Sequence, residues 1–362
     1  MSLLDTIADI PAALWDRVVG DDHPGLSHRY LAAVEGPHRY GLVYQDRHLV
    51  AVACFALDQI NLDLFLPTDS RLRALIGRIR AWWPRFLAPR VLECGPPGAS
   101  GPGLCMVAGL TEGQRARIRA ALVRTAGELA CLHGARLTVL RDFREPQGFE
   151  RLGYRAVPNL QETEIDIRWT SFDQYLGAMR SGYRRAIQRD LDRLAGLRQE
   201  TTEDFRRHAD RMAQLWRQTN QRPHGYDREQ LDARYFRALP DGTVAMLFWQ
   251  DRTLVAFTVS LVGGRTLVPL WLGVDYSVDA PLVFGCYYGA VGLAIQRGLT
   301  RVLMGDTTYE VKLRLGARLV DQTMYCRLPG LTWLLAWAAR RTTPVSRERR
   351  NVFKTTADPG RR

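Results

Sequence analysis

The residues best suited to chemistry lie in one short segment, Gly305–Arg318. Asp306 stands where a strand is expected to end, and Lys312 falls in the first turns of the next expected helix, with Tyr309 between them. A fixed ammonium stabilises the negative charge that develops on a carbonyl oxygen when an amine attacks an ester or thioester. A nearby carboxylate can take the proton of that amine. The segment therefore predicts acyl transfer to an amine, with Lys312, Asp306 and Tyr309 as catalytic candidates.

Each of these residues also has a structural interpretation. Thr307 and Glu310 have the spacing of a capping box, so Glu310 is not taken as a catalytic base. Asp306 could be a second cap for the same helix, and Lys312 could be a solvated helix residue. No Ser-His-Asp or Cys-His pattern accompanies them, which favours direct transfer without a covalent enzyme intermediate.

A row of arginines lies along one side of the helix predicted over residues 171–195. Its apolar residues recur at three- and four-residue steps and predict the buried face: Leu176, Met179, Tyr183, Ile187, Leu191 and Leu194. Arg185, Arg189 and Arg193 form a row beside that face, and a guanidinium can bind two phosphate oxygens at once. We take Arg184, Arg185 and Arg189 as donor- or phosphate-binding candidates. A solvated face, partly neutralised by neighbouring aspartates, is the alternative.

Aromatic residues and one histidine complete the candidate site. Tyr287 and Tyr288 could stack on an adenine of the donor, although filling the core is the favoured interpretation of both. His224, Tyr226 and Trp271 are candidates for binding the acceptor.

Two repeated patterns indicate the elements that position these residues. Residues 45–51 and 250–256 share the pattern Gln-Asp-Arg-x-Leu-Val-Ala, and each predicts a hairpin of antiparallel strands. Residues 149–155 resemble residues 312–318, and each segment predicts a short helix ended by Gly before a strand. Because both echoes occur in the same order, we predict a duplicated α/β unit.

The order of elements predicts the fold class. The second half is expected to contain, in order, helices at 171–195 and 202–220, strands at 243–250, 254–262 and 266–274, helix 281–297, strand 301–304, helix 308–315 and strand 319–327. This is the order of the GNAT acyltransferase fold. The first half is expected to begin with a helix over 2–18 and to end with strand 163–167.

We therefore predict an α/β (α+β) protein of two GNAT-like lobes in tandem, each a mixed, mostly antiparallel sheet flanked by helices. The predicted domains are an N-terminal lobe over 1–170, a C-terminal lobe with the active site over 171–328, and an amphipathic helix with a basic tail over 329–362.

The segment 305–318, which reads GDTTYEVKLRLGAR, resembles the closing motif of tandem-GNAT proteins of the Fem aminoacyltransferase family and of relatives described as acetyltransferases. Residues 180–189, which read RSGYRRAIQR, support the resemblance, which covers residues 30–330. It implies transfer of an aminoacyl group from aminoacyl-tRNA, or of another activated acyl group, onto an amine, with Lys312 supporting the tetrahedral intermediate. The chain lacks the family's long helical arm, which argues against a sugar-nucleotide peptide acceptor.

The donor is predicted from what two loops lack. GNAT enzymes hold the pyrophosphate of coenzyme A on free backbone amides at a helix N-terminus. At that place the second half has Val274–Gly285, which contains two aspartates, a proline and no basic residue. The corresponding loop of the first half, Gly95–Gly103, contains no basic residue and three prolines, which have no N–H to donate. Both loops are therefore poor sites for a pyrophosphate. We predict aminoacyl-tRNA as the donor and no tightly bound cofactor, with an acyl-CoA or acyl-carrier-protein donor as the alternative.

The composition limits the class of protein. The 362 residues are 46% hydrophobic, which suffices for two cores, and the net charge of +12 is concentrated in residues 180–198 and 340–362. Basic patches of this kind suit a polyanion such as tRNA. Six cysteines without a C-x-x-C pair predict reduced core thiols and no metal site.

The chain is expected to be cytoplasmic. Ser2–Trp15 carries aspartates and no basic residue, unlike a leader peptide, and Ala280–Gln296 is too short to span a bilayer. A second class stays open, a non-catalytic RNA-binding or membrane-binding protein. Leu331–Arg341 is a Trp-bearing helix followed by a basic tail, a pattern found at membrane surfaces, so peripheral membrane contact is an alternative to docking of this helix on the second lobe.

Overall fold

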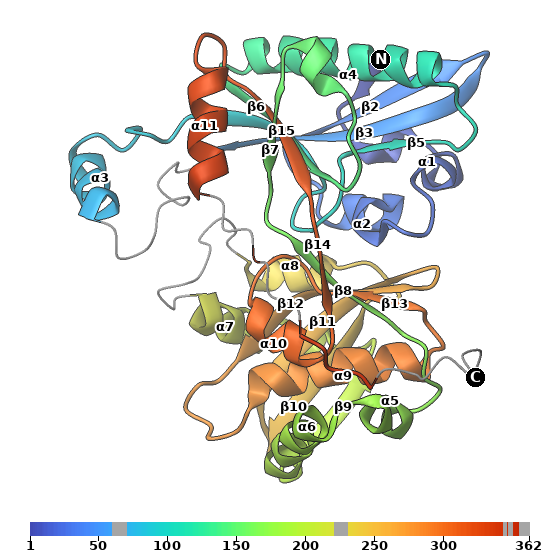
Figure 1. Ribbon diagram of the computed structural model, residues 1–362, viewed down its shortest axis with the longest axis vertical. Coiled ribbons are helices and arrows are strands. Elements are labelled where there is room, and N and C mark those ends of the chain that lie inside the picture. Colours follow the sequence, from blue (N-terminus) through green and yellow to red (C-terminus); the bar gives the residue numbers. More distant parts are fainter. Residues whose placement is uncertain (60–70, 221–230, 343–345, 347–349, 355–362) are drawn as a thin grey trace, which may run out of the picture.

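The computed structural model describes residues 1–59, 71–220, 231–342, 346 and 350–354, and the structural statements below concern these residues. Two α/β lobes lie one above the other, each built on one sheet with helices packed against it (Figure 1). The predicted pair of lobes with mixed, mostly antiparallel sheets is confirmed.

The upper lobe is built on a sheet of eight described strands in the order β1-β2-β3-β4-β6-β15-β7, with β5 paired to β3. Its strands from the first half of the chain are β1 (Ser2–Leu4), β2 (His38–Gln45), β3 (His48–Gln59), β4 (Arg90–Cys94), β5 (Leu104–Met106), β6 (Leu137–Phe143) and β7 (Arg155–Pro158). Its helices are α1 (Ala12–Val19), α2 (His28–Ala33), α3 (Arg71–Trp82), α4 (Glu112–Leu132) and α11 (Thr332–Thr342).

The lower lobe is built on a sheet of seven described strands in the order β14-β8-β13-β12-β11-β10-β9. These strands are β8 (Glu162–Asp166), β9 (Arg198–Thr202), β10 (Val244–Gln250), β11 (Thr253–Gly263), β12 (Thr266–Val274), β13 (Arg301–Leu303) and β14 (Arg318–Val320); β15 (Thr323–Arg327) follows in the chain. The helices are α5 (Phe172–Ala178), α6 (Ser181–Leu194), α7 (Ala209–Asn220), α8 (Ala233–Ala238), α9 (Leu282–Gln296) and α10 (Tyr309–Arg314).

The two hairpins expected from the repeated pattern are confirmed. Two-residue turns at 46–47 and 251–252 join β2 to β3 and β10 to β11. Asp46 and Asp251 both have positive φ, 48° and 52°, as tight hairpin turns between twisted strands require. The register shifts at the equivalent place in both hairpins, between the strand residues that precede each turn. The halves thus share details of backbone geometry as well as sequence.

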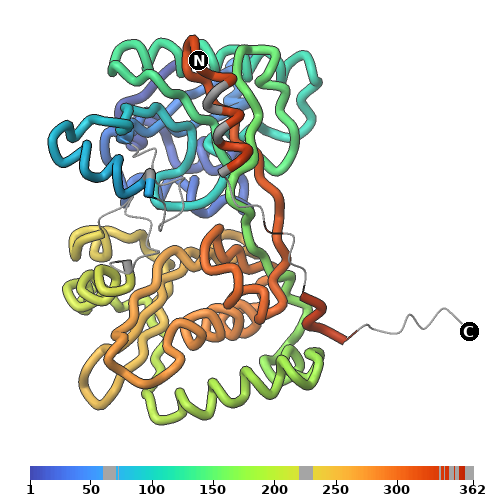
Figure 2. Tube along the Cα trace, turned by 60° about the vertical axis from the view of Figure 1, so that its left-hand side comes forward, coloured from blue at the N-terminus to red at the C-terminus, as the bar shows by residue number. Residues whose placement is uncertain are grey.

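The two halves exchange strands, which differs from the prediction. The strand expected to complete the first half, β8, lies in the lower sheet between β13 and β14. In return β15 joins the upper sheet between β6 and β7, and the two crossing segments run side by side between the lobes (Figure 2). An alternating apolar pattern predicts a strand but not the sheet in which it pairs. The division at residue 170 does not coincide with the two sheets, and as a domain boundary it stays a prediction.

The helix predicted over 171–195 is broken. α5 ends before Met179, whose extended backbone pairs with Phe353, and α6 begins after Arg180. The predicted buried face is largely correct because Leu176, Met179, Ile187 and Leu194 are all buried. The break occurs because residues 350–354 pass across it, and Arg180 N donates to Val352 O.

Three further predictions about helices are wrong. Residues 2–18 contain β1 as well as α1, and α7 begins only at Ala209, after the edge strand β9. The C-terminal helix α11 packs on β7 and β15 of the upper lobe, where Ala336 is buried, and not on the second lobe. The upper sheet accepts it there because β15 has been exchanged into that sheet.

Candidate active site

The turn before α10 is held by the exchanged strand β8. Thr163 on β8 donates its backbone N–H and its hydroxyl to the carbonyl of Gly305, at 3.0 and 2.6 Å. Gly305 has φ 72°, and Thr308 has φ 56°, a strained conformation for a β-branched residue. The turn that carries Asp306 is thus fixed by a strand from the first half of the chain.

The predicted capping box is wrong. Thr308, not Thr307, precedes α10, and it makes no side-chain cap hydrogen bond. A capping box needs an extended N-cap residue, and the left-handed Thr308 does not provide one. Glu310 is exposed, and within the described residues Asp306 accepts no hydrogen bond from α10. The structural interpretation of Asp306 as a second cap is therefore unsupported.

Lys312 is buried, with only 1% of its surface exposed. Its Nζ lies 5.6 Å from the centroid of the Tyr287 ring on α9, and it makes no hydrogen bond or ion pair within the described part of the chain. Burial lowers the pKa of Lys312 to about 8, and the carboxylates of Asp306 and Glu162 oppose that shift. The solvated-lysine alternative is wrong because this ammonium is nearly out of water.

The carboxylate of Glu162 belongs to a network that joins the two lobes. Arg144, which follows β6 in the upper lobe, donates to Glu162 at 2.8 Å and to Glu164 at 2.7 Å. Gln322 also donates to Glu162, at 3.3 Å, and Arg318 pairs with Glu164. Burial raises the pKa of Glu162, while Arg144 lowers it. One arginine of the upper lobe thus pairs with two buried carboxylates of β8, one of which, Glu162, acts on the charge of the lysine.

A carboxylate of the upper lobe, that of Asp142 on β6, faces the same region. Asp142 has φ 67°, accepts from the Gly101 amide at 3.0 Å and accepts from Asn159 at 2.6 Å. Burial raises its pKa to about 6, and the charge of Asp306 adds to the rise while Arg141 opposes it. The loop 95–103 is therefore held at the junction of the lobes.

Sequence reasoning missed Asp142, Arg144 and Glu162. They come from strands that are separated in the chain from 305–318 and that meet it only through the strand exchange. A buried Glu-x-Glu on a β-strand, as at 162–164, is the one signal in the sequence that could have drawn notice to them.

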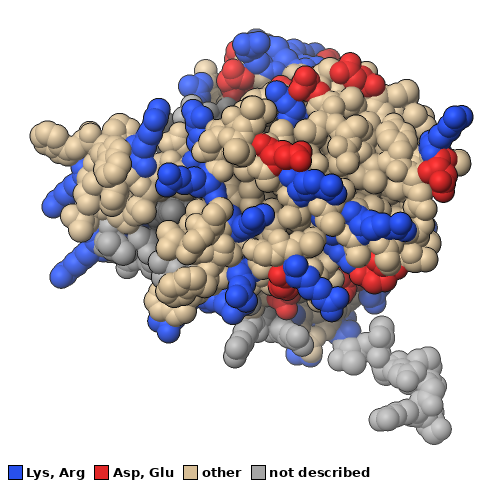
Figure 3. All heavy atoms as spheres, turned by 90° about the horizontal axis from the view of Figure 1, so that it is seen from above, with Lys and Arg blue, Asp and Glu red and all other residues tan. Residues whose placement is uncertain are grey.

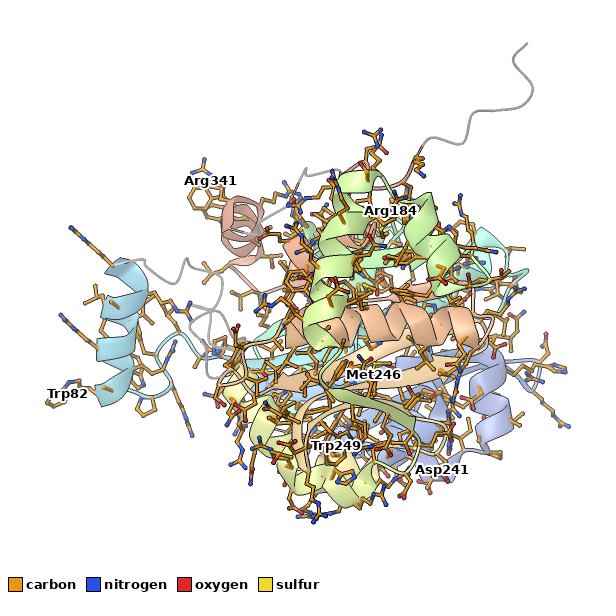
Figure 4. The ribbon with its side chains drawn as sticks, turned by 90° about the horizontal axis from the view of Figure 1, so that it is seen from below. Trp82, Arg184, Asp241, Met246, Trp249 and Arg341 are labelled. Carbon is orange, nitrogen blue, oxygen red and sulfur yellow. The ribbon has the colours of Figure 1, made fainter. Side chains whose placement is uncertain are left out.

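The candidate arginines of α6 do not contact Lys312 in the structure. Arg185 and Arg189 are exposed and Arg184 is half-buried on α6 (Figure 4), and within the described residues none of them contacts Lys312 or Asp306. α6 instead meets α10 through Asp190, which accepts from Arg314 at 2.8 Å and from the hydroxyl of Tyr288 at 2.6 Å. Tyr287 and Tyr288 are both buried in the core, as the favoured interpretation expected.

Of the acceptor candidates, the structure places only Trp271, because His224 and Tyr226 lie outside the described residues. The Trp271 indole on β12 donates to the hydroxyl of Tyr235 at 2.9 Å. That hydroxyl lies 3.4 Å from the hydroxyl of Tyr30, which donates to Pro97 in the loop 95–103 at 2.8 Å. Tyr30 and Tyr235 are 205 positions apart, so equivalent residues of the two halves meet beside Trp271.

The position equivalent to Lys312 in the upper lobe is Phe149. Phe149 is fully buried, and its ring packs against Phe143, Tyr154 and Tyr325. A phenyl ring in an aromatic cluster cannot stabilise an oxyanion, so only the lower lobe keeps a charged group at this place.

Two further observations concern metal binding and membrane spans. Among the described residues, no group of three or more His, Cys, Asp or Glu side chains is arranged to hold a metal ion. No helix in the same part of the chain is long and apolar enough to cross a bilayer.

The central strands of the lower lobe separate next to this site. β12 and β13 run parallel but pair only at Thr266 with Arg301 and at Leu267 with Val302, so they diverge toward Gly305. Two lobes of this topology, with diverging central strands and a charged closing helix, define the class of tandem-GNAT proteins. The chain belongs to the FemAB-like family, described as peptidoglycan biosynthesis/recognition, whose model matches residues 96–322.

Known proteins support this class. The chain is 27% identical over 280 residues to a putative 8-amino-7-oxononanoate synthase 2 of Mycobacterium tuberculosis, covering 72% of this chain and 36% of that protein. It thus spans about a third of the length of the curated relatives it matches. The fold is similar to that of FemX, with 13% identity, coverage of 92% of this chain and 98% of that one, and a TM-score of 0.57. It is also similar to the C-terminal domain of a putative lysylphosphatidylglycerol synthetase from Agrobacterium fabrum, with 12% identity, coverage of 92% and 96%, and a TM-score of 0.57.

Proposed function

We propose that this chain is an acyltransferase that moves an aminoacyl group from aminoacyl-tRNA onto an amine by direct attack. Lys312, Asp306 and Tyr309 form its catalytic site, and the C-terminal half of the chain, residues 171–328, carries it. The observation that carries the proposal is the buried Lys312 ammonium, which has no hydrogen-bond or ion-pair partner in the described residues. Burying an unpaired charge is costly, so its presence next to a strained turn supports a role toward a ligand.

The choice of lysine supports the same role. The chain contains 50 basic residues, of which only Lys312 and Lys354 are lysines. A guanidinium is planar, broad and always charged, whereas an ammonium is compact and can lose its proton near neutral pH when it is buried. A protein that uses arginine almost everywhere else keeps lysine where those properties matter.

Lys312 and Asp306 are sufficient to account for each step of the proposed transfer. The acceptor nitrogen attacks the ester carbon, a C–N bond forms, and the carbonyl oxygen becomes an oxyanion beside Lys312. The attacking nitrogen gives its proton to Asp306, the C–O bond breaks, and the ribose oxygen of the tRNA leaves with the proton that Asp306 took up. Tyr287 holds the ammonium against its ring face during these steps.

The donor side is assigned to the basic face of α6, with Arg184, Arg185 and Arg189 binding phosphates of the tRNA. Coenzyme A fits less well because the loop before α9 carries two aspartates and a proline and supplies no basic residue of its own for a pyrophosphate. Asp275 accepts from Arg211, and Asp279 pairs with Arg193. The acceptor is a small amine that contacts Trp271, His224 and Tyr226. We place the reaction in the cytoplasm, where charged tRNA is available.

The purified protein is expected to retain tRNA and to transfer a labelled amino acid from aminoacyl-tRNA to hydroxylamine. Binding is measured by an RNase-sensitive gel shift at near-physiological salt, and transfer by loss of label from the tRNA. A protein that ignores tRNA but is stabilised by acyl-CoA and transfers from it would be the alternative, an acyl-CoA-dependent N-acyltransferase. A protein that binds tRNA without transferring its amino acid would be a binding protein.

We expect the transfer rate to fall as the pH rises through about 8. The protonated form of Lys312 stabilises the oxyanion, and its pKa is held at about 8, so the active form is lost above that value. The rate is measured with a saturating donor and hydroxylamine as an acceptor of low basicity. A rate that instead rises through about pH 8 would mean that neutral Lys312 acts as a base.

A further inference from the structure

Exposed large apolar side chains gather in two short segments of the upper lobe. Of the twelve such residues among those described, seven lie within residues 75–87 and 331–337: Leu75, Trp82, Trp83, Leu87, Leu331, Trp333 and Trp337. Trp82 is 93% exposed and Trp333 is 64% exposed. Scattered apolar side chains need no explanation, but two clusters of tryptophan and leucine do.

The first segment is strongly basic. Residues 71–90, which include α3, contain six arginines and no acidic residue. Arg71, Arg78 and Arg85 are exposed, and they form no ion pair with any residue that the structure describes. This one segment therefore carries a charge of +6, which is half as large as the net charge of +12 of the whole chain. Among the side chains that the structure describes on α3, Ile76 is the one buried apolar residue.

The second segment forms a groove of about 390 Å³ on α11, which is lined by Arg155, Trp333, Ala336, Trp337, Arg340 and Arg341. Arg341 lies over the Trp337 ring at 4.2 Å, and Arg340 is tied to the upper sheet by donating to Ala156 O at 3.0 Å. The groove therefore combines three guanidinium groups with two indole rings on a docked helix. We call residues 71–90 and this groove together the Trp–Arg face.

The two parts of the face lie on the same side of the molecule. α3 and α11 both project to the left in Figure 1 and again, from below, in Figure 4, where Trp82 points outward. Seen from above, Lys and Arg side chains project from the left-hand edge of the molecule, where no Asp or Glu side chain shows (Figure 3). One flat partner can therefore contact both parts at once.

We propose that the Trp–Arg face binds the surface of an anionic phospholipid bilayer. The indoles and leucines enter the boundary between headgroups and acyl chains, and the arginines bind lipid phosphates. A bilayer is favoured over tRNA because the exposed leucines have no favourable contact to make with an RNA backbone. Their transfer from water into lipid, in contrast, is favourable. The bound enzyme would hold its lower lobe, with Lys312, away from the membrane. The proposal does not rest on the proposed acyl transfer.

Flotation of the full chain with vesicles tests this proposal. The chain is expected to float with vesicles of phosphatidylcholine and phosphatidylglycerol, and roughly ten-fold less with phosphatidylcholine alone. Replacing Trp82, Trp83, Trp333 and Trp337 with alanine is expected to reduce flotation about ten-fold or more. Changing Arg71, Arg78 and Arg85 to glutamine is expected to reduce it by a similar factor. All seven side chains are exposed, so the fold, checked by circular dichroism, should persist.

Matched variants elsewhere on the surface serve as controls. Leu132→Ala with Tyr276→Ala removes exposed apolar groups outside the face, and Arg124→Gln with Arg252→Gln removes exposed charges. Both control proteins should float like the wild type. The proposal is overturned if the wild type does not float, if the control and face variants lose flotation equally, or if the face variants lose only a tRNA gel shift. Transfer from aminoacyl-tRNA in the absence of vesicles reports on the proposed function separately.

Discussion

Replacing Lys312 with methionine is expected to lower kcat for acyl transfer by about 10²–10³-fold. Methionine has nearly the same length and fills the same space, so the variant removes the charge and leaves the packing intact. The ammonium in the wild type is 1% exposed and lies 5.6 Å from the Tyr287 ring, which leaves no water to replace it at the oxyanion. The loss is measured as single-turnover transfer from aminoacyl-tRNA.

The chain provides its own control for this experiment. Lys354 is the only other lysine, and its exposed side chain donates to Gly177 O at 2.8 Å, far along the chain from the closing motif. Lys354→Met should therefore transfer at the wild-type rate. The fall in rate above about pH 8 should also disappear in Lys312→Met. Wild-type transfer by Lys312→Met would show that the catalytic assignment is wrong.

Replacing Arg144 with alanine is expected to lower the free energy of unfolding by about 2 kcal/mol near neutral pH. Arg144 pairs with the buried carboxylates of Glu162 and Glu164. Without it Glu164 keeps its ion pair with Arg318, but Glu162 keeps only the hydrogen bond from Gln322 in a poorly hydrated place. The estimate is below that for a fully buried pair because the side chain of Arg144 is itself 37% exposed, so water screens it. The change is measured by urea denaturation.

The pH dependence of this loss has a definite sign. Burial raises the pKa of Glu162, and above that pKa its carboxylate is charged, so the full deficit is expected there. As the pH falls, Glu162 takes up a proton in both proteins and the wild type loses its Glu162–Arg144 ion pair, so the difference between the two proteins shrinks. Arg168→Ala is the matched control, because the Arg168–Asp166 pair is exposed and its loss should change stability by less than about 0.5 kcal/mol. Equal effects of Arg144→Ala and Arg168→Ala would contradict the argued role of the network.

Local patterns determined much of the architecture. The hairpins at 46–47 and 251–252 followed from a repeated turn sequence between apolar runs, and the buried face of 171–194 followed from its periodicity. The break at Met179 did not, because the cause is a segment more than a hundred residues later. The capping box failed for a similar reason: β8 fixes the turn at Gly305, and the chain enters α10 through a left-handed Thr308.

The sequence by itself determined that this chain has two related lobes and that Asp306 and Lys312 lie in one closing motif, because both properties are contiguous in the chain. Only the tertiary structure decided that Lys312 is buried, that Arg144, Asp142 and Glu162 surround the motif, and that the two halves exchange β8 and β15. The physical reason is that a strand's own pattern specifies its faces, while its hydrogen-bonding partners depend on which edge the folded chain offers it. The environment of the lysine is therefore a property of the assembled lobes.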